Sequence, residues 1–124
     1  MRQVTDPVVL ILFSMLACSS PPPEAIQWTL EWKNDGRWKL TGNNPTNRSF
    51  RVEQIVIVFL DREGFSEGWD RCKDVTIPAF SKKTLHGFVP PKHRIASSLY
   101  DVDAAYLEFP NGTRLGPFRR PLYR

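Results

Sequence analysis

Cysteine and histidine are scarce in this chain, which has two residues of each among 124. A protein zinc site takes three or four protein ligands at suitable spacing. Two histidines and one or two cysteines do not supply such a set, so we expect no metal and no other bound cofactor. The sequence also lacks a glycine-rich phosphate loop, a metalloprotease helix motif and a nucleophile elbow. These absences argue against the common enzyme classes, and we do not expect an enzyme.

Long hydrophobic runs are missing as well. The apolar run near the start extends from Pro7 to Ala17, about eleven residues, whereas a membrane-spanning helix needs about 20. The run is instead of the length found in a secretory signal peptide, with a positive charge before it at Arg2 and small residues after it. An ordinary secretory signal, an uncleaved anchor and a buried segment of a soluble protein are three interpretations of this run.

The residues at the end of this run carry a resemblance. Met15-Leu16-Ala17-Cys18 resembles the lipobox of bacterial lipoproteins. The resemblance implies that residues 1–17 are removed, that the Cys18 thiol carries diacylglycerol, and that the new N-terminus is acylated. It also implies, from Ser19 in place of the Asp that retains such proteins in the inner membrane, a lipid-anchored position on the outer membrane facing the periplasm. Two or more acyl chains hold a protein stably on a bilayer.

The mature chain divides into a tether and one domain. Residues 18–25 contain three consecutive prolines, which favour the extended polyproline II form, at about 3.1 Å per residue. We expect the lipidated Cys18 and this proline-rich tether to project a single domain formed by residues 26–124, because a chain of that length suits one small core.

The domain has the pattern of short strands. Residues 26–33 alternate between apolar and polar, Asn34-Asp35-Gly36 predicts a hairpin turn, and the alternation resumes through Leu40. Residues 55–60 are apolar at every position, which predicts a central strand covered on both faces. The change of pattern at Glu53-Gln54 predicts a bulge. An irregular segment is expected at 65–74, turns at 61–64 and 111–112, and further strands at 75–77, 83–89, 104–109 and 113–118.

This succession of short strands predicts a single antiparallel β-sandwich. The layout resembles bacterial immunoglobulin-like modules, in which an apolar strand ends in an acidic residue, a turn and a glycine, as Ile55 to Gly64 does here. A proline-containing step then leads into another strand, here Ile77 to Val89. The resemblance covers about half of the domain and implies a binding or structural role, with no catalysis.

Three tryptophans fall in the first predicted hairpin. Trp28, Trp32 and Trp38 share one face, which we interpret as core because aromatic side chains bury large areas. A platform for carbohydrate or peptide is the alternative. Trp69 lies in the segment predicted to be irregular, and we expect it to be exposed and to be a candidate for binding a partner.

Cys72 has no partner within the chain if Cys18 is lipidated. We interpret it as a small buried residue, with an intermolecular disulfide or a reactive thiol as alternatives. A small envelope enzyme using Cys72 with His86 or His93 is a second hypothesis for function. A structural lipoprotein without a specific partner is a third.

The formal net charge is +4, and removal of residues 1–17 leaves it at +4. A basic protein outside the cytosol is attracted to anionic lipids, cell-wall polymers or acidic proteins, and nucleic acid is not an expected partner there. The last six residues, 119–124, contain three arginines. Besides Trp69, the candidate partner-binding residues are Arg119, Arg120, Tyr123 and Arg124, although a solvated tail also fits. The favoured function is a lipid-anchored interaction module of the cell envelope, bound to membrane lipid through Cys18 and to an envelope protein.

Overall fold

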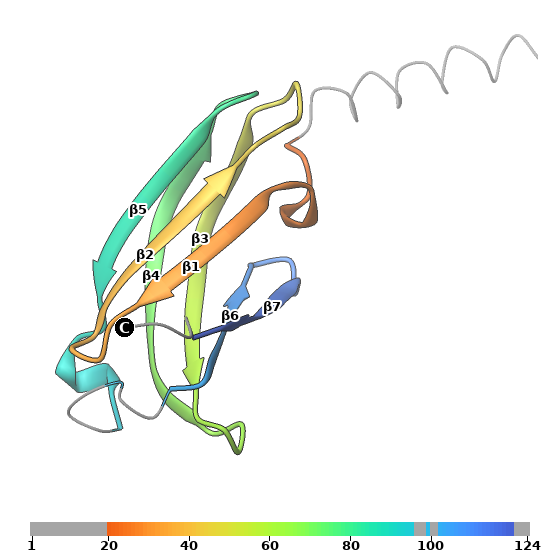
Figure 1. Ribbon diagram of the computed structural model, residues 1–124. Coiled ribbons are helices and arrows are strands. Elements are labelled where there is room, and N and C mark those ends of the chain that lie inside the picture. Colours follow the sequence, from red (N-terminus) through yellow and green to blue (C-terminus); the bar gives the residue numbers. More distant parts are fainter. Residues whose placement is uncertain (1–19, 96–98, 100–101, 121–124) are drawn as a thin grey trace, which may run out of the picture.

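Two antiparallel sheets face each other in the computed structural model, which describes residues 20–95, 99 and 102–120 (Figure 1). One sheet has the order β1-β2-β5, from β1 (Gln27–Trp32), β2 (Arg37–Asn43) and β5 (Lys82–Phe88). The other has the order β4-β3-β6-β7, from β4 (Ser66–Ile77), β3 (Phe50–Leu60), β6 (Ala104–Glu108) and β7 (Arg114–Arg119). Within the described part of the chain two short 3-10 helices accompany them, η2 (Pro23–Ala25) and η3 (Pro91–His93). The predicted fold class, a small β-sandwich, is confirmed.

The distribution of strands between the sheets follows the immunoglobulin-like scheme with one change. The first, second and fifth strands form one sheet, and the third, sixth and seventh belong to the other, as in that scheme. In constant-type immunoglobulin domains the fourth strand joins the sheet of the first strand. Here β4 pairs with β3 along almost its whole length and so extends the opposite sheet.

The predicted hairpins form where the turn chemistry places them. Gly36, with φ of 104°, closes the β1–β2 turn, in which Lys33 N–H donates to the Arg37 carbonyl. Leu30 then pairs with Leu40, and both side chains point into the core. Gly64 and Gly112 likewise adopt positive φ in the β3–β4 and β6–β7 turns.

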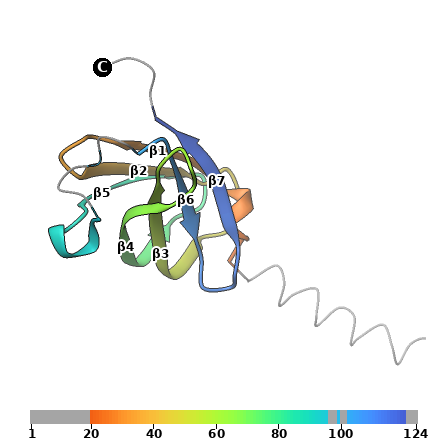
Figure 2. The same ribbon diagram turned by 90° about the horizontal axis from the view of Figure 1, so that it is seen from below.

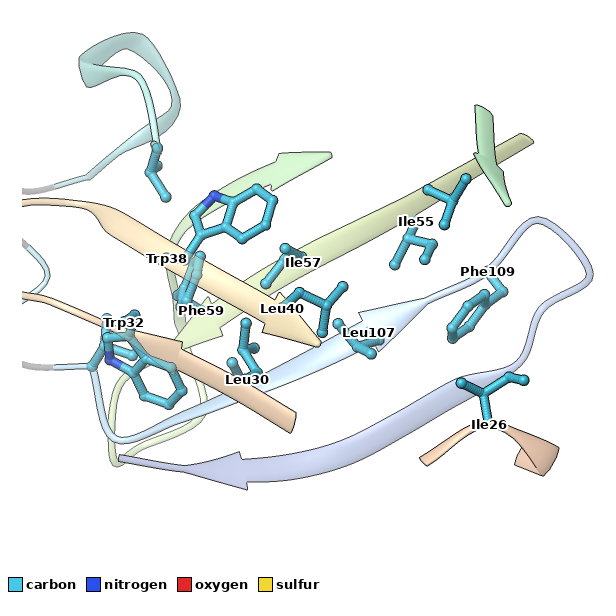
Figure 3. Close-up of a cluster of buried hydrophobic side chains, with 14 of the residues drawn as sticks. Ile26, Leu30, Trp32, Trp38, Leu40, Ile55, Ile57, Phe59, Leu107 and Phe109 are labelled. Carbon is cyan, nitrogen blue, oxygen red and sulfur yellow. The ribbon is translucent and has the colours of Figure 1, made fainter. Parts of the chain in front are cut away.

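The core lies between the sheets. Figure 3 shows side chains of β1 and β2 directed toward those of β3 and β6. Trp32 and Trp38 are buried, and Trp28 is partly buried against the rings of Phe50 and Phe109. The three tryptophans are therefore core residues as predicted, and the alternative of an exposed platform is wrong. The largest fully buried side chains are Phe50, Phe59, Leu40, Ile55, Ile57, Ile77, Leu99 and Leu107.

The segment predicted to be irregular is a strand. Residues 66–77 form β4 without interruption, so the prediction of an irregular segment over 65–74 is wrong. The inward positions of its first half hold Gly68, Asp70 and Cys72, which are small or polar and give no apolar alternation. They are accommodated because the Trp38 indole reaches across from β2, donating from Nε1 to the Asp70 carboxylate at 2.9 Å.

The predicted bulge at Glu53-Gln54 is a switch of face instead. Val52 pairs with Val75 and Gln54 pairs with Lys73, so the register is kept, and the shift in register comes later, between Phe59 and Leu60. The buried positions of β3 nevertheless change from even to odd numbers between Phe50 and Ile55. The partner strand makes the same change at Asp74, which has φ of 52°.

The described part of the tether packs against the sandwich. Pro21 and Pro23 are buried, and Trp28 Nε1 donates to the Pro23 carbonyl at 3.0 Å. The Arg51 backbone N–H donates to the Ser20 hydroxyl at 2.9 Å, at the start of β3. From Ser20 onward the chain therefore does not act as a free spacer, and the expected projection of the domain is shortened accordingly.

Candidate functional site

The outer face of the four-stranded sheet carries a row of apolar and aromatic side chains. Val58 in the centre of β3 pairs with Trp69 of β4 on one side and with Tyr106 of β6 on the other. Val56 lies next along β3, and these four side chains are all partly exposed. We call the outer-face set Val56, Val58, Trp69 and Tyr106 the Trp69 patch. Figure 2 shows no further described layer over this face of the sheet.

Neighbouring residues fix the ring of Tyr106. The Arg114 guanidinium lies over it, with Cζ 4.0 Å from the ring centroid, and Arg114 Nε also lies 3.5 Å from a Glu108 carboxylate oxygen. On β7, Gly116 leaves room for the ring, since an added Cβ there would come within 2.9 Å of the Tyr106 ring. Tyr106 is thus held in one orientation at the surface, which lowers the entropy cost of binding through it.

Trp69 is held as well. Its ring stacks on His93, with centroids 3.9 Å apart and an interplanar angle of 18°. His93 belongs to η3, and the backbone after it pairs with the free edge of β4, where Ile95 N–H donates to the Glu67 carbonyl at 3.0 Å. The predicted exposure of Trp69 is therefore only partial, and the residue sits in a strand.

Two strongly exposed apolar side chains adjoin this end of β4. Ile95 is 78% exposed, and Phe65, in the turn directly before β4, is 70% exposed. Isolated apolar side chains on a surface need no explanation, but a group of them next to a row of aromatics is typical of binding surfaces. Ile95, whose backbone pairs with Glu67 two residues before Trp69, thus adds a strongly exposed apolar side chain beside the Trp69 patch.

The outer face of the other sheet is polar by contrast. Thr29, Thr41 and Thr84 form one cross-strand row, and the Thr41 and Thr84 hydroxyls are 3.3 Å apart. In the next row Lys39 Nζ lies 3.6 Å from a Glu31 carboxylate oxygen. Apart from Phe88, which is 46% exposed and lies under the Arg94 guanidinium, this face is polar, whereas its counterpart carries a row of apolar side chains.

Cys72 and the histidines do not come together. Cys72 pairs with Ile55 on the core side of β4. His86 is exposed and lies opposite Lys39 on the other sheet, and His93 stacks on Trp69. Burial, and then the charge of Asp70, raise the pKa of the Cys72 thiol to about 11. The thiol is therefore protonated at neutral pH, the opposite of what an activated nucleophile requires.

The candidate tail residues have different positions. Arg119 is exposed at the end of β7. Arg120 donates from Nη1 to the Val102 carbonyl at 3.0 Å and to the Leu99 carbonyl at 3.3 Å, so its guanidinium holds the loop before β6. Tyr123 and Arg124 lie outside the described residues, as do Cys18 and Ser19.

A cavity of about 350 Å³ lies where the proline-rich segment meets the β6–β7 turn, lined by Ser20, Phe50, Arg51, Glu53, Phe109 and Asn111 among others. No group of three or more His, Cys, Asp or Glu side chains that could hold a metal ion is found among residues 20–95, 99 and 102–120. Within the same residues no helix has the length and apolar character needed to cross a membrane.

Comparison with family models, with curated proteins and with solved structures finds no match for this chain. The function proposed below therefore rests on the β-sandwich fold and on the residues of its surfaces.

Sequence reasoning missed Val58 and Tyr106 as surface residues. The signal for Val58 is the apolar run over residues 55–60, which supplies two apolar faces and predicts a strand covered on both sides. The structure buries Ile55, Ile57 and Phe59 and leaves the alternate residues on the outer face partly exposed. The prediction of complete cover by the described fold is therefore wrong, and that apolar outer face is what most needs a functional explanation.

Proposed function

We propose that this protein is a lipid-anchored interaction module of the cell envelope that binds a protein partner through the Trp69 patch. The partly exposed apolar outer face of β3, between Trp69 and Tyr106, is the observation that carries the proposal. Aromatic residues and arginine are enriched at protein interfaces, and rigid aromatic side chains dominate their binding energy.

The surroundings of the patch define the kind of partner. Arg71 pairs with Val56 on one side, and Arg114 lies over Tyr106 on the other. Both arginines are exposed. Glu108 pairs with Val56 on that other side and lies 3.5 Å from Arg114, so the border carries charges of both signs. A partner that fits would be an envelope protein with an apolar centre bordered by carboxylates opposite Arg71 and by basic groups opposite Glu108, because like charges facing across an interface weaken it.

The anchor is proposed from the sequence. Acylation of Cys18 would place the module on the periplasmic side of the outer membrane, as expected from the lipobox resemblance and Ser19. Incorporation of labelled palmitate should occur in the wild-type protein and be lost in Cys18→Ala. Equal labelling of the two, or none in either, would contradict the anchor.

The binding surface is tested in intact cell envelopes by photo-crosslinking. A photoreactive amino acid at Ile95, beside the patch, should give a discrete adduct, whereas the same group at His86, on the polar face, should not. Val58→Lys should abolish the Ile95 adduct. Thr41→Lys is its matched control, because Thr41 is also β-branched, partly exposed and central in its sheet.

Adducts of equal yield from positions 95 and 86 would contradict the proposed face. An Ile95 adduct that survives Val58→Lys would contradict the role of the patch.

A further inference from the structure

The chain joins the sandwich at one end, opposite the end that holds the β3–β4 turn (Figure 1). The Ser20 hydroxyl is bonded to the Arg51 backbone there. Cys18 precedes Ser20 by two residues, and a fully extended chain spans at most about 3.6 Å per residue. A two-residue connection can therefore reach at most about 7 Å from Ser20. An acyl group on Cys18 would enter a bilayer directly beside this end of the domain.

Two connections form this end. They are the β2–β3 loop and the β4–β5 turn, which are joined by the Phe80 N–H donating to the Thr46 carbonyl at 3.0 Å and by Asn44 N–H donating to the Ser81 carbonyl at 2.8 Å. The Phe80 ring projects from the turn and is 72% exposed, although the residue has an unfavourable φ of 54°. An apolar ring is thus presented to the surroundings by a braced backbone.

The two connections are basic, and the exposed residues Glu53 and Asp74 directly flank them in sequence. Residues 43–52 and 75–84 contain Arg48, Arg51, Lys82 and Lys83 and contain no Asp or Glu. Arg51, Lys82 and Lys83 are exposed. We call residues 43–52 and 75–84 the basic tip. A basic surface with an exposed aromatic ring is the combination that binds at anionic lipid interfaces.

The opposite end offers a natural comparison. Phe65 has nearly the same exposure as Phe80, at 70%. It is surrounded in sequence by Asp61, Glu63 and Glu67, with Arg62 as the only base between residues 61 and 67. An anionic surface would attract the basic residues around Phe80 and repel the acidic residues around Phe65.

We propose that the basic tip lies against the headgroups of an anionic phospholipid bilayer, with the Phe80 ring inserted at the interface. This inference rests on the proposed acylation of Cys18, which brings the tip to the membrane. Each lysine or arginine near an anionic leaflet strengthens attachment by about fivefold. The tip therefore orients the sandwich on the bilayer, and the lipid anchor alone would leave it free to tumble.

The experiment uses the full acylated protein in vesicles, labelled with an environment-sensitive fluorophore at Phe80→Cys or, as the control, at Phe65→Cys. Cys72 reacts little at neutral pH because its thiol is protonated, and the unsubstituted protein gives the labelling blank. We expect the label at 80 to shift to shorter wavelength in phosphatidylglycerol vesicles and to be quenched by lipid-borne quenchers. The label at 65 should report water. Pure phosphatidylcholine vesicles should give a much smaller shift at 80, and so should the addition of Lys82→Glu with Lys83→Glu.

Equal emission from the two positions would overturn the inference, and so would a shift at 80 that is the same in both kinds of vesicle. Mass spectrometry of the same protein separates the two proposals. A chain without acyl groups would refute the anchor itself, whereas an acylated chain with a water-exposed label at 80 would refute only the tip.

Discussion

Trp38 is the residue on which one side of the sandwich depends. Its indole starts on β2, packs over Gly87 of β5 and donates to Asp70 of β4, so that a single side chain contacts both sheets. The Trp38 ring fills the space next to Gly87, so a larger residue does not fit there. Its Nε1 needs an acceptor, which Asp70 supplies, and this is why β4 has no apolar residue at that inward position.

Gly87→Val tests this relation. An added Cβ at position 87 would collide with the six-membered ring of Trp38, so we expect a loss of about 1–3 kcal/mol in the free energy of unfolding. His86→Val, on the next residue and directed outward, should change stability by less than about 0.5 kcal/mol. Denaturant unfolding followed by tryptophan fluorescence measures both. Equal midpoints for the two variants would show that the ring does not fill this space.

Cys72 gives the stability of the fold a dependence on alkaline pH. Burial and the Asp70 carboxylate raise the pKa of the thiol from 9.0 to about 11. The unfolded chain releases this proton near pH 9 while the folded chain keeps it, so the unfolding free energy should fall as the pH rises from 9 to 11. Below pH 9 the thiol should contribute no dependence.

Cys72→Val removes this titration. The difference in unfolding free energy between the wild-type protein and the variant should be constant below pH 9 and change only above it. Comparing the two proteins cancels the titration of lysines, which both share. Parallel curves from pH 9 to 11 would mean that the folded thiol ionises as readily as the unfolded one.

At the scale of elements, Asn44 connects two loops. Its side chain is fully buried, and its Nδ2 donates to the carbonyls of Arg48, Ile77 and Pro78 at 2.8–3.2 Å. Its Oδ1 accepts from the Thr46 N–H and hydroxyl. One amide thus provides the contacts that backbone pairing does not supply between the β2–β3 loop and the end of β4.

Asn44→Ala should lower the unfolding free energy by about 2 kcal/mol, because it removes the buried hydrogen bond to the Ile77 carbonyl together with the partly buried bonds to Arg48, Pro78 and Thr46. Asn47→Ala, in the same loop but exposed, should have little effect. Chemical denaturation of the two variants checks the difference. Equal unfolding free energies for Asn44→Ala and Asn47→Ala would contradict the role of the Asn44 amide in holding the two connections together.

The elements that could be predicted are those whose information is local. The β1–β2 and β6–β7 hairpins follow from alternation and from Gly36 and Gly112 in turns that require positive φ. The end of β4 is predicted at residues 75–77, but its first half is not, because the small and polar inward residues there pack against Trp38. The switch of face at Glu53 and Asp74 depends on both strands changing together. Trp69 is a candidate from the sequence because it is a tryptophan in a segment predicted to be irregular and therefore exposed. Val58 and Tyr106 join it only through strand pairing, which no local pattern contains.

At the scale of the whole molecule, charge and apolar surface are separated. The basic tip and the Trp69 patch lie on different parts of the sandwich, one at the end where the chain joins the domain and one on the outer sheet face nearer the other end. The surface proposed to bind lipid and the surface proposed to bind protein could therefore be occupied together.

The length of β4 sets a height. From Ile77 at the tip to Trp69 the strand advances by eight residues, which at about 3.3 Å each amounts to about 26 Å. If the basic tip lies on the phospholipid headgroups, a partner that binds Trp69 would do so in the aqueous space, away from the leaflet. The sandwich would then fix the distance between the membrane surface and Trp69. A partner would need to be a domain in the aqueous space, or one held at that distance from its own membrane anchor by a linker.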